Sequence, residues 1–376
     1  MPLLSELSDL QGRLQGELFP ELAAALGPLT GLAQLLVTVI EMVPIGTFIV
    51  PTPGLPGRPP CERAALFRAF IAKAVHRIPM TSLLIERLKC DRTMRMLCGW
   101  SCAGEVPSEA TFSRAFAEFA ESELPTRVHT ALIACTHKDR LVGHISRDST
   151  SIAAREKPVK IETAKRCRKK QRPKRGEPGW ENTRRLERQG EMTLAEMLAD
   201  LPRHCAVGVK PDAKGFKMTW TGYKLHLDVA DGGIPLTGLL TSASLHDSQA
   251  AIPMTMMTSQ RVVACYELMD SAYQAPEIIA AVRAQGRVPI IPEQARRAKG
   301  RKAELDGEAL ARRHANYLTA EQVRYRERTT AERVNGRMKD EFGADHVRVR
   351  GAEKVLCHLM FGVLALTVDQ LMRLIC

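Results

Sequence analysis

The chain has 376 residues, of which 45% are hydrophobic, so it is long enough for two or three domains and apolar enough to form real cores. This composition excludes a disordered adaptor protein. The formal net charge of +12 predicts a surface that attracts polyanions, either nucleic acid or an anionic membrane face.

Several observations favour nucleic acid over a membrane. The apolar stretch 32–50 comes closest to a membrane span, but Glu41 and Pro44 interrupt it. The opening residues lack the basic region and cleavage site of a signal peptide. The ten cysteines form no Cys-x2-Cys pair, which argues against structural zinc. We therefore expect a cytoplasmic protein with reduced thiols, a nucleic-acid partner and no membrane partner.

The first part of the chain is expected to be helical. Residues 1–54 predict an N-terminal helical arm, followed by a stretch rich in Pro and Gly. Residues 55–140 show apolar spacings of three and four, which predict a helical DNA-binding domain. Within it, PSEATFSRAF makes Ser108 the N-cap of a helix whose first turn holds Thr111, Ser113 and Arg114. This turn suits phosphate contact in a helix-turn-helix, but an ordinary capped surface helix has the same pattern.

Residues 141–376 are expected to form an α/β catalytic domain. Short β-rich runs occur at GHISRD, TGYKLHLDVA, PLTGLLTSAS, RVVACYELMD and RVPIIP, with helical patterns between the later ones. This order predicts a mixed sheet whose first half is antiparallel and whose later strands are connected by helices. The apolar pattern 353–375 predicts a helix buried against that sheet rather than a membrane span, because it contains several charged residues.

Positive charge is concentrated in one segment of this domain. Residues 155–188 contain fourteen Lys or Arg against five Glu, an excess of nine of the chain's twelve net charges. We interpret 155–210 as a basic insertion in the catalytic domain. A cluster of this density would raise DNA affinity by counterion release, whereas the competing interpretation is an inert solvated loop.

Two aspartates follow β-rich runs directly. Asp148 is expected to end the first strand, and Asp270 is expected to end the fourth. Acids at strand ends lie at the rim of a sheet, where the sites of α/β folds gather. Exchange of a phosphodiester puts charge on the attacking and leaving oxygens, and two Mg²⁺ ions held by carboxylates can stabilise both. A single Asp at a strand end is more often a turn former or a helix cap.

A third acid belongs to a polar stripe on a predicted helix. Glu332 lies in Tyr-x2-Arg-x3-Glu-x6-Lys, and these spacings bring Tyr325, Arg328, Glu332 and Lys339 to one side of an α-helix. Another side, expected to face the core, holds Val323, Ala331, Val334 and Met338. Gly336 adjoins the polar stripe and is expected to let another backbone approach closely. The alternative is a solvated helix face on which Arg328 and Glu332 form a surface ion pair.

At this point the residues resemble a known family, the bacterial insertion-sequence DDE transposases. YRERTTAERVNGRMK matches the family's Tyr-x2-Arg-x3-Glu-x6-Lys signature at every position. TGYKLHLDVADGGIPLTGLLTSASLHDSQ is similar to the strand pair and His-Asp-Ser turn of the family, and MDSAY is similar to its Asp-x-Gly-Tyr element with Ala272 in place of Gly. The resemblance extends upstream to the helical patterns and covers about residues 55–376.

The resemblance implies an RNase H-like mixed sheet with flanking helices, preceded by an all-helical N-terminal domain. It implies that Asp148, Asp270 and Glu332 hold two Mg²⁺ ions, for which Mn²⁺ can substitute. It also implies that Tyr325, Arg328 and Lys339 contact the transposon-end DNA. His226 and His246 also invite an acid or base role, although we favour structural roles because two-metal phosphoryl transfer activates its own water.

The expected function is therefore a DNA transposase that cleaves transposon ends and joins them to target DNA. Its expected partner is double-stranded DNA, on which it is expected to act as a homodimer in the bacterial cytoplasm, associated with the nucleoid. Two alternatives stay open: a domesticated, catalytically silent DNA-binding protein and a stand-alone RNase H-like nuclease.

Overall fold

A computed structural model describes residues 3–43, 45–49, 62–137, 140–159, 180, 183–211, 216–293 and 302–375. The chain forms two compact units. We call the first the helical unit; it comprises Met1–Lys138, Ile152–Glu156 and Gly336–Cys376. The second, the sheet unit, comprises Asp139–Ser151 and Lys157–Asn335. The stretch 50–61, most of the linker rich in Pro and Gly, lies outside the described residues.

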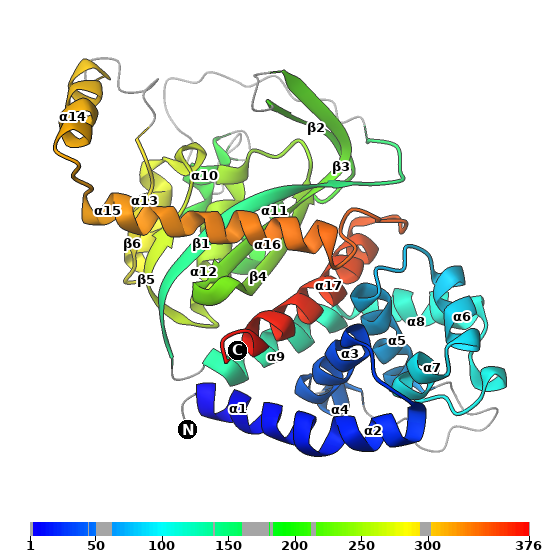
Figure 1. The fold of residues 1–376 in the computed structure, drawn as a ribbon. Helices are drawn as coiled ribbons and strands as arrows, with labels where there is room; N and C mark the ends of the chain where they lie inside the picture. The colour runs from blue at the N-terminus through cyan, green and yellow to red at the C-terminus, as the bar shows by residue number, and fades with distance from the viewer. Residues whose placement is uncertain are drawn as a thin grey trace. The chain divides into compact units, whose positions relative to one another are not determined.

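The helical unit confirms the expected helical character of the first part of the chain (Figure 1). Its N-terminal helices are α1 (Leu3–Arg13), the π-helical turn η1 (Leu14–Leu18), α2 (Phe19–Leu26), α3 (Gly31–Met42) and α4 (Ile45–Phe48). Beyond the linker follow α5 (Arg63–Val75), α6 (Thr81–Cys90), α7 (Arg92–Cys98), the 3-10 turn η2 (Ala103–Glu105), α8 (Glu109–Glu121) and α9 (Leu124–His137). Ser108 occupies the N-cap position of α8 as predicted, but its side chain makes no capping hydrogen bond and instead contacts the Thr111 hydroxyl at 3.3 Å.

The centre of the helical unit is the C-terminal helix α17 (Ala352–Met372). It packs against α3, α5, α8 and α9, and Phe361 joins an aromatic cluster with Phe67, Phe70 and Phe116. Length and composition alone would let α17 cross a membrane, but 78% of its most apolar window is buried. A helix that is apolar all round suits such a core. Its packing partners are therefore helices, where the sequence pattern suggested a sheet.

The sheet unit contains a six-stranded mixed sheet with the order β2-β3-β1-β5-β6, and β4 pairs with β3. The strands are β1 (Leu141–Ala153), β2 (Ala206–Pro211), β3 (Lys217–Ala230), β4 (Ile234–Ser242), β5 (Val263–Leu268) and β6 (Val288–Ile290). β3 is antiparallel to β2 and β4, whereas β1, β5 and β6 run parallel. An antiparallel half followed by helix-connected parallel strands is the RNase H-like α/β arrangement that the sequence predicted.

Helices cover both faces of this sheet. One face carries α12 (Ala251–Ser259), which packs on β4, α11 (Leu194–Asp200) and α13 (Pro276–Ala284). The other carries the segment formed by α15 (Ala320–Tyr325), the 3-10 turn η7 (Arg326–Arg328) and the first half of α16 (Thr329–Asp340), because Ser146 Oγ of β1 donates a hydrogen bond to Glu327 O. α10 (Arg185–Gln189), the 3-10 turns η4 (Asp231–Gly233), η5 (Asp247–Ala250) and η6 (Ser271–Tyr273), and α14 (Lys302–His314) complete the unit.

The compact units cut across the domain boundaries expected from the sequence. Residues 336–375, expected in the catalytic domain, lie in the helical unit. The basic residues 160–179, which carry most of the positive charge of the expected insertion, lie outside the described residues. The described residues 183–211 form α10, α11 and β2, and Arg185 and Arg188 pair with Asp200 at 2.6 and 2.8 Å. This later part of the expected insertion is thus an integral part of the sheet unit.

Two predicted elements differ in detail. β1 does not end at Asp148 but continues to Ala153, because Thr150 and Ile152 continue the alternation of buried side chains. β2 was not predicted at all. Its sequence AVGVKP contains Gly and Pro, and Val207 and Val209 are exposed, so it lacks the apolar alternation of a half-buried strand.

The predicted helix with the polar stripe is broken into three pieces. Arg326–Arg328 forms a 3-10 turn between α15 and α16. Thr329 Oγ1 donates a hydrogen bond to Arg326 O at 3.0 Å, a local bond that competes with regular α-helical bonding. Upstream of the turn Val323 is 51% exposed, contrary to its expected core position, whereas the three apolar residues of α16, namely Ala331, Val334 and Met338, are buried as predicted. Gly336 has open space at its Cβ position, so no close backbone approach explains it.

Candidate active site

Asp148 and Asp270 lie on neighbouring parallel strands. β1 and β5 pair in a register that places Ser146 opposite Leu268. Each aspartate lies two residues further along its own strand, so the continued register brings the two carboxylates to adjacent positions at one edge of the sheet. Asp270 follows the end of β5, as predicted, and its Oδ1 accepts a hydrogen bond from Ala272 N at 2.8 Å.

Asp148 is largely buried and has two side-chain partners. Asn335 Nδ2 donates a hydrogen bond to its Oδ2 at 3.0 Å, and Arg328 Nη1 lies 3.9 Å from its Oδ1. Burial raises the pKa of Asp148, and this effect outweighs the opposing hydrogen bonds and positive charges, which come from Ser149, Asn335, Arg328 and Lys210. The site therefore favours a compensating cation next to this carboxylate.

Arg328 lies between two of the three predicted metal ligands. Its guanidinium is paired with Glu332 one helical turn further on and also faces Asp148. Burial lowers the pKa of Arg328, but the fields of Tyr325, Glu332, Asp148 and Asp270 raise it more strongly, so the net shift is upward. One guanidinium thus feels the negative charge of all three predicted metal ligands. The three acids gather around a single point of the sheet unit.

The remaining residues of the predicted stripe lie in two places. Arg328 Cζ lies 5.9 Å from the centre of the Tyr325 ring, and burial followed by the field of Asp270 keeps the pKa of Tyr325 raised despite Arg328. Lys339 lies on α16 seven residues after Glu332 and is half-buried. It belongs to the helical unit, whereas the other five predicted site residues belong to the sheet unit.

The chemistry of these side chains fits a hard divalent cation, because all three acids offer oxygen ligands. In the described part of the chain, however, no three His, Cys, Asp or Glu side chains are close enough together to hold one ion. The pairing of Glu332 with Arg328 accounts for this. An ion that uses all three acids requires Glu332 to leave that guanidinium.

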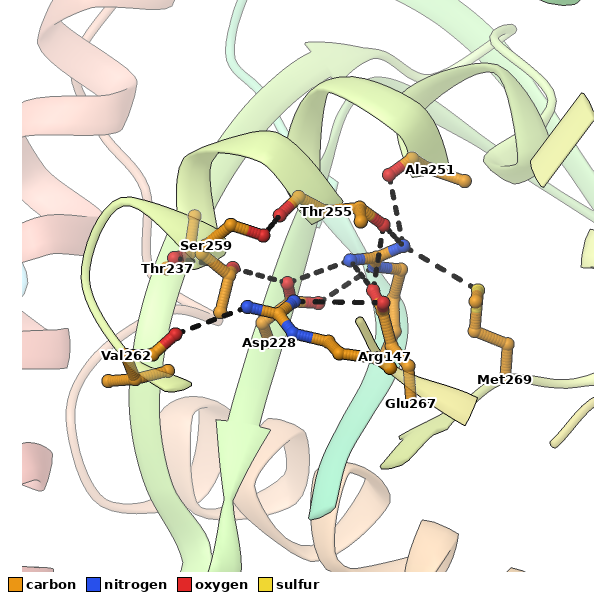
Figure 2. A network of polar contacts seen from close by, with 11 residues as sticks. Arg147, Asp228, Thr237, Ala251, Thr255, Ser259, Val262, Glu267 and Met269 are labelled. Atoms are coloured by element: carbon orange, nitrogen blue, oxygen red, sulfur yellow. Dashed lines mark hydrogen bonds and ion pairs between the residues drawn. The ribbon is translucent and has the colours of Figure 1, made fainter. Parts of the chain in front are cut away.

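The opposite face of the sheet carries a second, fully buried cluster of charge (Figure 2). Arg147 Nε and Nη2 bind both oxygens of Asp228 at 2.7 and 2.8 Å, and Nη2 also contacts Glu267 at 2.5 Å. All three side chains are completely buried. Arg147 Nη1 reaches Ala251 O and Thr255 Oγ1 of α12 as well. The cluster therefore ties β1 to β3, β5 and α12 directly behind Asp148.

Three residues around the site were missed or undervalued by sequence reasoning. Asn335 lies one helical turn after Glu332, so the i, i+3 spacing was the available signal. Arg147 was detectable as a charged residue inside an otherwise apolar strand. Tyr273 of the Asp-x-x-Tyr element is buried with an unpaired hydroxyl, and burial, followed by the field of Asp247, raises its pKa well above 10. No sequence pattern distinguishes such an unpaired hydroxyl from an ordinary core tyrosine.

The two histidines have structural surroundings. His226 is completely buried and its Nε2 lies 2.8 Å from Thr241 Oγ1, while burial lowers its pKa to about 4. His246 is the N-cap of η5 and accepts a hydrogen bond from Ser248 N. These contacts agree with the structural roles favoured from the sequence.

The comparisons with known proteins agree with this geometry. A family model described as a transposase DDE domain matches residues 144–368, and a second, described as a transposase domain, matches residues 32–118. No curated protein and no solved structure matches the chain. The first model covers well over half of the sequence and includes all six predicted site residues, and the family implies DNA binding and dependence on a divalent metal. The chain therefore belongs to the DDE transposase family and is a DNA transposase.

Proposed function

We propose that this transposase cleaves the ends of its own element and joins them to target DNA, with Asp148, Asp270 and Glu332 as its metal-binding residues. The observation that carries the assignment is the Arg328 guanidinium, on which the fields of all three acids converge. The continued β1–β5 register supports the pairing of the first two acids.

The bound metal is proposed to be two Mg²⁺ ions, which Mn²⁺ can replace; when bound, they stabilise charge on the attacking and leaving oxygens. Asp148 and Asp270 enter this site from the rigid sheet, whereas Glu332 enters from α16. Tyr325, Arg328 and Lys339 are proposed to hold the phosphates and bases of the transposon end. Placing both groups on one segment couples the position of the DNA to the position of the third acid.

Further features complete the proposal. The basic residues 160–179 are proposed to add non-specific DNA affinity, and α8 of the helical unit is proposed as a further DNA contact. Joining two ends requires two active sites, so the working form on DNA is proposed to be a homodimer. Such a protein acts at the nucleoid in the bacterial cytoplasm.

The direct test removes one ligand charge at a time. Asp148→Asn, Asp270→Asn and Glu332→Gln are each expected to abolish metal-dependent cleavage of DNA that carries the element's ends, while end binding stays intact. Glu327→Gln is the matched control, because it removes an exposed carboxylate five residues before Glu332. A variant that keeps a tenth of the wild-type cleavage rate removes that residue from the site.

The same assay separates the alternatives. Products in which a 3′ end of the element is joined to target DNA identify a transposase rather than a stand-alone nuclease. Wild-type protein that binds the ends but cleaves nothing with Mg²⁺ or Mn²⁺ is the domesticated DNA-binding protein instead.

A further inference from the structure

Asn335 connects α16 to the first aspartate. It lies three residues after Glu332, on the same side of the helix, and donates its Nδ2 hydrogen bond to Asp148 Oδ2 at 3.0 Å. The two residues are 187 positions apart in the chain. Asn335 is only 6% exposed, so this contact is shielded from solvent. Among the residues that the structure describes, no other side chain donates to that carboxylate within normal hydrogen-bond distance.

The hydrogen bond determines which carboxylate oxygen remains available. Asn335 binds Oδ2, and Oδ1 of Asp148 faces Arg328, the cation that also pairs with Glu332. A neutral amide does this without adding charge to the acidic cluster. An aspartate at the same position would bring a fourth carboxylate against Asp148, and a lysine would neutralise it.

A second observation points to a missing partner at this residue. Asn335 Oδ1 is buried and accepts no hydrogen bond. Buried acceptors are rarely left unpaired, because they lose their hydration without compensation. The amide is oriented by its neighbour, since only Nδ2 can donate to a carboxylate. Oδ1 is thus free to accept from a water molecule that a cation between the carboxylates would bring with it.

We infer that Asn335 is a positioning residue of the metal site: it fixes Oδ2 of Asp148, leaves Oδ1 for the cation, and presents its own Oδ1 to the cation's water. This inference rests on the proposed function of Asp148. Partners that orient the ligands of a metal typically change its affinity by about 10- to 100-fold when removed.

The test measures Mn²⁺ binding to the full chain without DNA, by calorimetry. Asn335→Leu keeps the approximate shape and loses the amide, and Asn335→Asp keeps the shape and replaces the donor by a charge. We expect Asn335→Leu to weaken Mn²⁺ binding about tenfold or more. Asn335→His, which keeps a ring N–H near the same position, is expected to recover part of the affinity. End-DNA binding in the absence of metal is expected to be unchanged.

Thr330→Val is the matched control, because it removes another buried hydrogen-bonding group of α16, one that contacts Arg333 rather than Asp148. Wild-type Mn²⁺ affinity in a folded Asn335→Leu protein overturns the inference. Loss of cooperative melting in both the Leu and Asp variants overturns it as well, because it assigns Asn335 a purely structural role. If the wild-type chain itself binds no Mn²⁺ and cleaves no end DNA, it is the proposed function that fails.

Discussion

Arg328 competes with a divalent cation for the carboxylates of Asp148 and Glu332. In this structure its guanidinium pairs with both. Arg328→Ala removes the competing charge, so we expect the DNA-free protein to bind Mn²⁺ more tightly than wild type. Cleavage is expected to fall at the same time, because the variant no longer has the guanidinium that is proposed to hold the transposon end. Opposite changes in metal affinity and activity are the signature of this competition.

The exposure of the three side chains sets the size of the effect. They are 18%, 22% and 49% exposed for Arg328, Asp148 and Glu332, so solvent screens both ion pairs. Partly exposed pairs contribute roughly 0.2–1 kcal/mol each, and the two together about 1 kcal/mol. Since about 1.4 kcal/mol corresponds to a tenfold change, we expect the Kd for Mn²⁺ to fall about fivefold.

Calorimetric titration with Mn²⁺ in the absence of DNA measures this change. Arg333→Ala is the control, because it removes the same charge from the same helix at a residue that contacts Thr330 instead of the acids. An unchanged or weaker Mn²⁺ affinity in Arg328→Ala refutes the competition. Equal tightening in Arg333→Ala refutes it too, since the effect then comes from net charge alone.

Three further predictions concern other parts of the chain. Neutralising basic residues of the segment 160–179 is expected to flatten the slope of log K against log salt by about 0.9 for each DNA phosphate that the variant no longer neutralises, and an unchanged slope makes the segment a bystander. Arg147→Met leaves two buried carboxylates without their cation and is expected to lower the free energy of unfolding by about 3–5 kcal/mol in chemical denaturation, with Arg147→Lys less damaging. A loss below about 1 kcal/mol in the Met variant contradicts this reasoning. Burial keeps His226 neutral with a pKa lowered to about 4, so below pH 6.5 the unfolded chain takes up a proton that the folded chain does not. Stability is therefore expected to fall with decreasing pH by up to about 1.4 kcal/mol per unit from this residue, and His226→Gln, followed by denaturation at pH 5 and pH 7, is expected to remove that dependence.

The strands of the sheet were predictable where one or both sides are buried. The runs that became β1, β3, β4, β5 and β6 are apolar or alternating, and this pattern is the direct consequence of a buried sheet. β2 has no such pattern, because it pairs with the exposed end of β3, where Lys217 and Met218 face solvent. Pairing through backbone hydrogen bonds alone leaves little trace in the side chains.

The site was predictable in its residues but not in its local geometry. Spacings of three, four and seven indicate a helix, but they do not separate a continuous α-helix from one with a single 3-10 turn, which differs by only a few hydrogen bonds. The partners of α17 were unpredictable for another reason. A helix that is apolar on all sides carries no information about whether a sheet or other helices will surround it.

Two neighbouring residues show why burial decides what a charge cluster can do. Arg147 and Asp148 are adjacent in β1, so their side chains point to opposite faces of the sheet. Behind the sheet, Arg147 holds Asp228 and Glu267 with no exposure to water, and breaking such a cluster costs several kcal/mol. In front, Arg328 holds Asp148 and Glu332 at partial exposure for about 1 kcal/mol. A metal ion or a DNA phosphate can displace the second arginine from its partners but not the first. The buried cluster is therefore suited to keep the strands in place, and the exposed one to exchange partners during the reaction.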